Sequence, residues 1–192
     1  MAVFLCFTVL RAIIFPKDYL EVSVLYTLFN PRLCVTSLFD IDLEQLRQQG
    51  IKGIIFDLDN TIIPWDSADM CPQITSWLHE LVIQDFKVAI VSNNWNKRVK
   101  LIADRFNLPF VSRAYKPAKR GFHQALAAMG LQAQDAAVIG DQLFTDVLGG
   151  NRMGMYTIWV KPLTTHEFIG TRVHRKLENI VIRILKEKGL MK

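Results

Sequence analysis

The stretch Gly53-Ile54-Ile55-Phe56-Asp57-Leu58-Asp59-Asn60-Thr61 decides how this 192-residue chain folds. Residues 53–56 form a short apolar run that lies between Gly50 and a polar turn. Such a run is typical of a strand that is buried on both faces of a parallel sheet. Asp57 and Asp59 therefore stand at the carboxyl end of a predicted strand, which is where sites form in open α/β sheets.

Outward from this stretch, predicted strands alternate with predicted helices. Further strands are expected at 86–91, 110–111, 136–140 and 155–160, and helices at 70–84, 96–106, 118–129, 143–149 and 167–188. We expect Gly130 to end the third of these helices, and Gly149-Gly150 the fourth. The alternation predicts a Rossmann-like α/β fold of three layers, in which a mainly parallel sheet carries helices on both faces.

The charge of the chain is unevenly distributed. Lys and Arg together number 23 against 18 acidic residues, which gives a net charge of +5. Residues 57–96 carry six acids and one base, whereas residues 97–120 carry eight bases and one acid. A basic excess suggests an anionic partner, and nucleic acid, a lipid headgroup and a phosphate ester all remain open at this point.

The helix predicted at 167–188 is strongly basic. Its expected apolar face consists of Val173, Leu177, Ile180 and Ile184, and its basic residues are Arg172, Arg175, Lys176, Arg183 and Lys186. One interpretation is ordinary packing with a solvated basic face. The other is contact with an anionic membrane surface, which attracts Lys and Arg side chains.

The chain is predicted to consist of an apolar extension, residues 1–28, and a single domain, residues 29–192. Arg11 interrupts the apolar run of the extension, which is too short for a membrane-spanning helix, and the pattern of a signal peptide is missing. Three interpretations stay open for it: a segment that packs on the core, an interfacial membrane anchor, or sequence upstream of the true start. The three widely spaced cysteines favour a reducing cytoplasm over a disulfide framework.

Polar clusters follow four segments of the predicted sheet, and each is weak evidence by itself because such residues also make ordinary turns. They are Asp57-Leu58-Asp59-Asn60-Thr61, Ser92-Asn93-Asn94, Lys116-Pro117 and Gly140-Asp141 with Asp146. One carboxylate of the first cluster can attack phosphorus, and the other can act as general acid and base. A Lys ammonium suits phosphate, and the acids of the last cluster suit a cation or a partnership with that Lys.

In this order the four clusters resemble the haloacid dehalogenase-like (HAD) hydrolase superfamily over residues 50–162. The resemblance implies that Asp57 is the nucleophile, that Asp59 is the general acid and base, and that Lys116 stabilises both Asp57 and the phosphoryl group. It also implies a phosphoryl-binding set and a Mg²⁺ site. The phosphoryl-binding residues would be Thr61, Ser92, Asn93 and Lys116, and the metal ligands Asp57, the backbone carbonyl of Asp59, and Asp141, with Asp146 supporting them. The short intervals between motifs imply a HAD core without a cap domain.

A closer resemblance covers residues 31–178. The segments FDLDNT (56–61), VSNN (91–94) and GDQLFTDVLGGNRMG (140–154) are similar to the YqeG-type branch, which is related to phosphatidylglycerophosphate phosphatases. This branch implies Mg²⁺-dependent conversion of phosphatidylglycerophosphate to phosphatidylglycerol, a step of phospholipid biosynthesis. It implies a cytoplasmic enzyme that associates peripherally with the inner face of an anionic membrane, where it meets a phosphorylated lipid headgroup.

Two alternatives remain beside the lipid phosphatase. One is a phosphatase for another phosphomonoester, either soluble or at the end of a nucleic acid. The other is a binding or regulatory protein that has kept the fold without catalysis. Nucleic acid is disfavoured as a partner because the basic blocks lack the interleaved aromatic residues that stack on bases.

Overall fold

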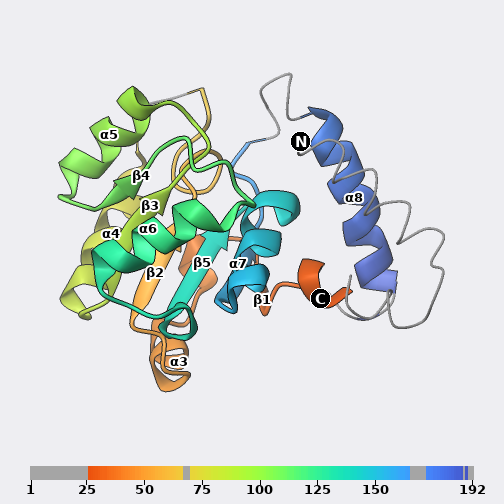
Figure 1. The fold of residues 1–192 in the computed structure, drawn as a ribbon, viewed down its shortest axis with the longest axis horizontal. Coiled ribbons are helices and arrows are strands. Elements are labelled where there is room, and N and C mark those ends of the chain that lie inside the picture. Colours follow the sequence, from red (N-terminus) through yellow and green to blue (C-terminus); the bar gives the residue numbers. More distant parts are fainter. Residues whose placement is uncertain (1–25, 67–69, 165–171, 188, 190–192) are drawn as a thin grey trace.

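The structure, a computed structural model, describes residues 26–66, 70–164, 172–187 and 189 (Figure 1). Its centre is one sheet of six strands in the order β1-β6-β5-β2-β3-β4, and every neighbouring pair is parallel. The strands are β1 (Leu33–Val35), β2 (Gly53–Phe56), β3 (Lys87–Val91), β4 (Phe110–Val111), β5 (Ala136–Gly140) and β6 (Tyr156–Val160). The predicted α/β fold with a parallel sheet is confirmed.

Helices cover both faces of this sheet (Figure 1). Their bounds are η1 (Leu38–Asp40), α3 (Leu43–Gln48), α4 (Pro72–Ile83), α5 (Asn96–Arg105), α6 (Lys119–Met129), η2 (Ala133–Asp135), η3 (Leu143–Val147), α7 (Leu148–Met153) and α8 (Arg172–Glu187). Ile54 and Phe56 pack in one core with α4 and α5, whereas Ile55 packs in another core with α6. Alternate side chains of β2 point to opposite faces, so this strand is buried on both sides.

The strand order reverses at β2. From β2 the chain proceeds to β3 and β4 on one side, and later to β5 and β6 on the other. The carboxyl ends of β2, β3 and β5 therefore meet at a switch point, which is the usual position of a ligand site in such sheets. In the part of the chain that the structure describes, α4 is the one helix between β2 and β3, and α5 the one helix between β3 and β4. This agrees with the expected uncapped core.

The expected end of the helix at 143–149 is wrong. The chain forms a π-helical turn, η3, and continues as α7 to Met153, where Gly154 with a φ of 76° ends the helix. Gly149 and Gly150 lie inside α7, close to neighbouring elements. A Cβ atom at Gly150 would lie 2.3 Å from a methyl carbon of Val138. The glycine pair therefore permits close helix–sheet packing and does not terminate the helix.

The expected apolar face of the carboxyl-terminal helix is also partly wrong. Leu177, Val181 and Leu185 are buried in α8, a spacing of four residues, whereas Ile180 is 40% exposed. The face is rotated because α8 packs its 177–181–185 stripe against η3 and Phe29. The predicted first residues of this helix, 167–171, and the side chain of Val173 lie outside the described residues. The short elements β1 and α3 were not predicted at all.

The segment around the predicted domain boundary packs on the domain. Phe29 is 1% exposed and lies edge-on to Phe144 with 5.4 Å between the ring centroids. Tyr26 and Leu28 pack against the same apolar cluster, and the side-chain amide of Asn151 donates through Nδ2 to the Leu28 carbonyl at 2.8 Å. Residues 1–25, to which the open interpretations of the extension mainly apply, lie outside the described residues. No helix within the described ranges combines the length and the apolarity that crossing a bilayer requires.

Candidate active site

A cavity of about 560 Å³ opens at the carboxyl ends of β2, β3 and β5. Its lining consists of Asp57, Asp59, Asn60, Trp65, Ser92, Asn93, Asn94, Trp95, Arg98, Lys116, Gln142 and Thr145. The lining thus brings together residues from three of the four predicted clusters with Gln142 and Thr145, which lie in the segment between Asp141 and Asp146 of the fourth. Three predicted site residues, Thr61, Asp141 and Asp146, are at most 1% exposed and are not among the lining residues.

The loop after β2 is held rigidly by its own apolar residues. Leu58, Ile62 and Ile63 have no exposed surface, and the Asn60 amide donates to the Ile63 carbonyl at 2.7 Å. Asn60 adopts a φ of 59°, a left-handed conformation that asparagine tolerates better than most residues. Fixing the loop in this way fixes the two carboxylates that flank Leu58.

Lys116 is the centre of the site. Its Nζ lies 2.7 Å from Oδ1 of Asp57 and 2.6 Å from Oδ1 of Asp146, and the residue is 4% exposed. The Asn93 side chain holds the Lys116 backbone at two points: its Nδ2 donates to the Lys116 carbonyl at 3.2 Å, and its Oδ1 accepts from the Lys116 amide at 2.6 Å. The Asn93 side chain therefore positions the ammonium, while the contact of the Asn93 backbone with a phosphoryl group stays a prediction.

The charges of this cluster act strongly on one another. Burial raises the pKa of Asp57 to about 7; the ammonium of Lys116 opposes this shift, whereas the charges of Asp146 and Asp59 add to it. Burial disfavours the charged form of Lys116, but the carboxylates of Asp146 and Asp57 outweigh burial and raise its pKa. Lys116 is therefore charged at neutral pH, and Asp57 needs further positive charge beside it to be fully ionised.

Asp59 faces the same cavity with a different set of partners. Its Oδ2 accepts from Nδ2 of Asn94 at 3.1 Å and from the Ser92 hydroxyl at 3.5 Å. Its Oδ1 lies 3.3 Å from Nη2 of Arg98 and makes no hydrogen bond within the described residues. A carboxyl group that lines the cavity can exchange a proton with a bound ester or with water.

Three buried carboxylates form a candidate metal site. Asp57, Asp141 and Asp146 each offer an oxygen within 4.8 Å of the others, and Thr61 donates to Oδ1 of Asp141 at 3.3 Å. Asp146 comes this close because Gly140 has no side chain; a Cβ there would lie 2.3 Å from the Asp146 carboxylate. An oxygen-only donor set of this kind suits Mg²⁺.

Arg175 of α8 is a functional residue that sequence reasoning missed. Its guanidinium pairs with Oδ2 of Asp141, donates to the Asp141 carbonyl at 2.6 Å, and contacts Oε2 of Glu178 at 3.0 Å. Glu178 in turn accepts from the Phe144 amide at 2.9 Å, and burial raises its pKa to about 7 against the opposing charge of Arg175. Among many basic residues on this helix, Arg175 carried no sequence signal except its spacing of three from an acidic residue.

We expect Arg175→Met to lower the free energy of unfolding by about 3 kcal/mol without metal, because Asp141 and Glu178 lose a shared cation in a buried place. Added Mg²⁺ is expected to stabilise this variant more than the wild type, since a divalent cation can then compensate Asp141. Urea unfolding with and without MgCl₂ measures both effects. Arg183→Met, on the exposed side of the same helix, serves as the control. Equal stability of the two variants would show that Arg175 does not stabilise the buried carboxylate of Asp141.

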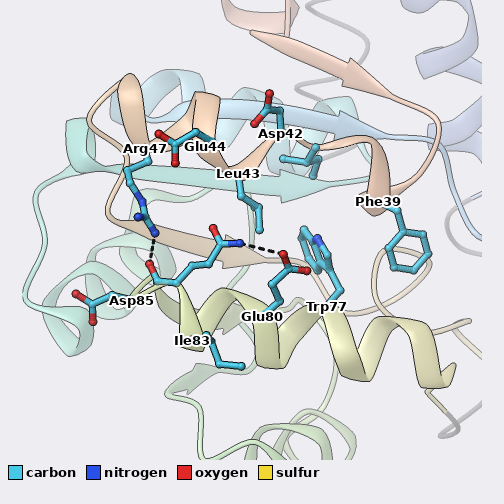
Figure 2. A pocket seen from close by; sticks show the side chains of 11 residues that line it. Phe39, Asp42, Leu43, Glu44, Arg47, Trp77, Glu80, Ile83 and Asp85 are labelled. Carbon is cyan, nitrogen blue, oxygen red and sulfur yellow. Dashed lines mark hydrogen bonds between the residues drawn. The ribbon is translucent and has the colours of Figure 1, made fainter.

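A larger cavity, of about 800 Å³, lies between α3 and α4 (Figure 2). Its walls are apolar at Leu43, Trp77 and Ile83, and acidic at Glu44 and Glu80. No buried cluster of carboxylates with a lysine occurs among its described lining residues. The catalytic chemistry of the fold therefore belongs to the smaller cavity.

Comparison with known proteins agrees with this geometry. A family model described as HAD-hydrolase-like matches residues 114–167, and one described as mitochondrial PGP phosphatase matches residues 19–101. The probable phosphatase YqeG of Bacillus subtilis is 43% identical over 84% of this chain and 94% of its own length. The mitochondrial phosphatidylglycerophosphatase GEP4 of Saccharomyces cerevisiae is 30% identical over 72% of this chain and 84% of its own.

Among solved structures, the cobalt-bound deoxy-D-mannose-octulosonate 8-phosphate phosphatase of Haemophilus influenzae superposes with a TM-score of 0.50. It is 15% identical, and the match covers 71% of this chain and 90% of that one, so the likeness concerns the fold. The relatives in sequence, the two family models and the assembled motifs agree with one another. The chain belongs to the YqeG and phosphatidylglycerophosphate phosphatase branch of the HAD-like hydrolases, and it is a phosphatase of that superfamily.

Proposed function

We propose that this protein is a Mg²⁺-dependent phosphomonoesterase that removes the terminal phosphate of phosphatidylglycerophosphate and leaves phosphatidylglycerol. The observation that carries the proposal is the buried pairing of Lys116 with Asp57 at 2.7 Å, beside a second carboxylate, Asp59, that lines an open cavity. This arrangement supplies a nucleophile, a fixed positive charge and a proton donor at one place.

The reaction follows from the roles of the two carboxylates. An oxygen of Asp57 bonds to phosphorus while the ester P–O bond breaks, and Asp59 gives its proton to the leaving alkoxide oxygen. Asp59 then takes a proton from water, whose oxygen attacks the aspartyl-phosphate and restores the Asp57 carboxylate. Lys116 keeps its charge throughout, because the carboxylates of Asp146 and Asp57 raise its pKa, and it stabilises the negative charge that gathers on the phosphoryl oxygens.

The metal would be held by the carboxylates of Asp57 and Asp141 and by the backbone carbonyl of Asp59, with Asp146 beside them. When bound, Mg²⁺ supplies positive charge that keeps Asp57 ionised and neutralises the dianionic ester. Asp146 also accepts from Nζ of Lys116 at 2.6 Å and from the backbone amide of Gln142 at 3.2 Å, so it links the segment after β5 to the lysine. Thr61 orients Asp141 from the other side.

The lipid substrate is supported by the names of the relatives and by the form of the site. GEP4, at 30% identity, is named as a phosphatidylglycerophosphatase, and the model matching residues 19–101 is described as a PGP phosphatase. The cavity is open to solvent. Between β2 and β4 the described residues form α4, β3 and α5, and no additional element is present there to cover the cavity. Such a site can reach a phosphate that a membrane presents, without removing the lipid from the bilayer.

The test is a comparison of phosphate release from phosphatidylglycerophosphate in detergent micelles with release from soluble phosphomonoesters and from a 5′-phosphorylated oligonucleotide. We expect release to require Mg²⁺ and kcat/KM to be at least about 100-fold higher for the lipid, a difference of about 3 kcal/mol in transition-state binding. Equal values for all three substrates would reject the lipid assignment and keep a general phosphatase. Absence of release from every substrate would favour the regulatory alternative.

A further inference from the structure

Exposed apolar side chains gather at the mouth of the catalytic cavity. Trp95 is 70% exposed and Tyr115 is 74% exposed, and they lie in the loops that follow β3 and β4. These two loops run side by side, since the Arg113 amide donates to the Asn94 carbonyl at 3.1 Å.

The same mouth carries positive charge. The guanidinium of Arg113 lies 4.0 Å from the centre of the Trp95 ring, and Lys97 is exposed in the first turn of α5. Of the eight basic residues at 97–120, Arg98 and Lys116 are used inside the site and Lys100 pairs with Asp104. Arg113 and Lys97 take part in no salt bridge between described residues, so their charge faces outward.

The backbone of the second loop is unusual for the residues that it carries. Arg113 and Tyr115 adopt φ values of 48° and 54°, a conformation that is costly for long and aromatic side chains. Burial of apolar surface does not offset this conformational free energy, because both side chains are exposed. Strain of this kind, held beside Lys116 by the contacts of Asn93, is typical of loops that serve a site.

We propose that these residues, Trp95 and Tyr115 with Arg113 and Lys97, form a rim that docks on an anionic phospholipid bilayer and seats the cavity over a headgroup phosphate. The proposal rests on the lipid phosphatase function proposed above. Trp and Tyr rings prefer the interface between water and acyl chains, and Arg and Lys are attracted by the charge of anionic headgroups. Tyr115 lies inside the basic block at 97–120, so that block carries an exposed aromatic ring, contrary to the expectation from sequence. A rim of this composition fits a membrane surface better than a soluble metabolite.

A second exposed apolar patch provides an internal contrast. Phe39, 51% exposed, and Ile83, 83% exposed, flank the cavity between α3 and α4 (Figure 2). The acids Asp42, Glu44, Glu80 and Asp85 surround that cavity, and among its described lining residues Arg47 is the one base. Acidic side chains are repelled by an anionic surface, so this patch is not expected to contact the bilayer. It supplies matched control positions.

The test is flotation of the full chain with vesicles of phosphatidylserine and phosphatidylcholine, which contain no phosphomonoester substrate. The double variant Arg113→Asn/Tyr115→Asn is expected to weaken partitioning to mixed vesicles about tenfold or more, and asparagine suits the left-handed backbone at both places. Lys97 lies outside the strained loop, and Lys97→Glu is expected to weaken partitioning to the vesicles several-fold. Phe39→Asn and Lys52→Glu, at the second patch and at the amino end of β2, are expected to leave partitioning unchanged.

Activity then separates this proposal from the function on which it rests. The double variant is expected to lose at least tenfold in rate on vesicles that contain phosphatidylglycerophosphate, and to keep the wild-type rate on a soluble phosphomonoester. Wild-type partitioning and wild-type vesicle rates in the double variant and in Lys97→Glu would overturn the rim, even if the lipid is the substrate. Rim-dependent binding without hydrolysis of phosphatidylglycerophosphate would support the rim and reject only the proposed substrate.

Discussion

Replacing Asp57 with asparagine is expected to lower kcat for phosphomonoester hydrolysis by ~10⁴-fold or more, which is the order of loss seen when a catalytic nucleophile is removed. The amide cannot form the acyl-phosphate intermediate, and the substitution hardly changes the volume of the side chain. Lys116 keeps its partner Asp146 at 2.6 Å, so the site is expected to remain folded. Phosphate release under saturating substrate and Mg²⁺ measures the effect.

The same variant has an expected signature in stability. Burial raises the pKa of Asp57 to about 7, from an ordinary value of 3.8, so the folded protein binds this proton more tightly than the unfolded chain does. The free energy of unfolding of the metal-free wild type therefore falls between about pH 4 and pH 7 as this group ionises. Asp57→Asn lacks that contribution, and its stability is expected to depend less on pH.

The control for both measurements is Asp104→Asn, an exposed acid that pairs with Lys100 on the surface of α5. It is expected to keep full activity and the pH dependence of the wild type. More than one-tenth of wild-type kcat in Asp57→Asn would exclude Asp57 as the nucleophile. Loss of folding in that variant would instead show that the carboxylate is needed for structure, which unfolding curves recorded beside the assay reveal.

Replacing Lys116 with methionine is expected to cost about 3–5 kcal/mol of the free energy of unfolding at pH 8, because two buried carboxylates lose their shared cation. The side chain is 2% exposed, and both ion pairs are shorter than 3 Å. Activity is expected to fall by ~10³-fold or more, since the transferring phosphoryl group loses its fixed positive charge. Urea unfolding without metal and phosphate release with Mg²⁺ measure the two losses separately.

The stability loss of Lys116→Met should depend on pH in a defined direction. Without the ammonium, the pKa of Asp57 rises further, and its carboxyl binds a proton more readily near pH 5. A neutral carboxyl needs no counter-ion, so the variant is expected to lose less stability at pH 5 than at pH 8. Lys52→Met removes an exposed ion pair with Asp135 and is expected to change stability by less than about 0.5 kcal/mol. A Lys116 variant that behaves like this control would contradict the role given to the buried pair.

The order of the motifs predicted much of the site, because each one follows a parallel strand directly or stands just before a helix. Asp57, Ser92 and Asp141 come immediately after β2, β3 and β5, and strands of a parallel sheet end on the same edge. Lys116 follows no long strand, but it was predicted from the Lys-Pro motif and lies within 3 Å of Asp57. Local sequence was sufficient here because the positions of the residues depend on strand ends.

Other contacts were not predictable in this way, because they depend on how distant elements pack. Arg175 reaches Asp141 from a helix 34 positions away, and only the burial of Leu177, Val181 and Leu185 sets the rotation of that helix. Asn93 holds the backbone of Lys116, a contact that exists only after β3 and the loop beyond β4 lie side by side.

The sequence by itself thus determined the class of fold, the parallel sheet and the residues that meet at its carboxyl edge, because period, turn residues and strand ends are local properties. The tertiary structure decided which side chains neutralise which. Buried charges need partners, and those partners are chosen by distance in space: Lys116 joins Asp57 to Asp146, and Arg175 joins Asp141 to Glu178. It also decided that exposed aromatic rings and cations share the mouth of the cavity, because the exposure of a side chain depends on how all the elements pack together.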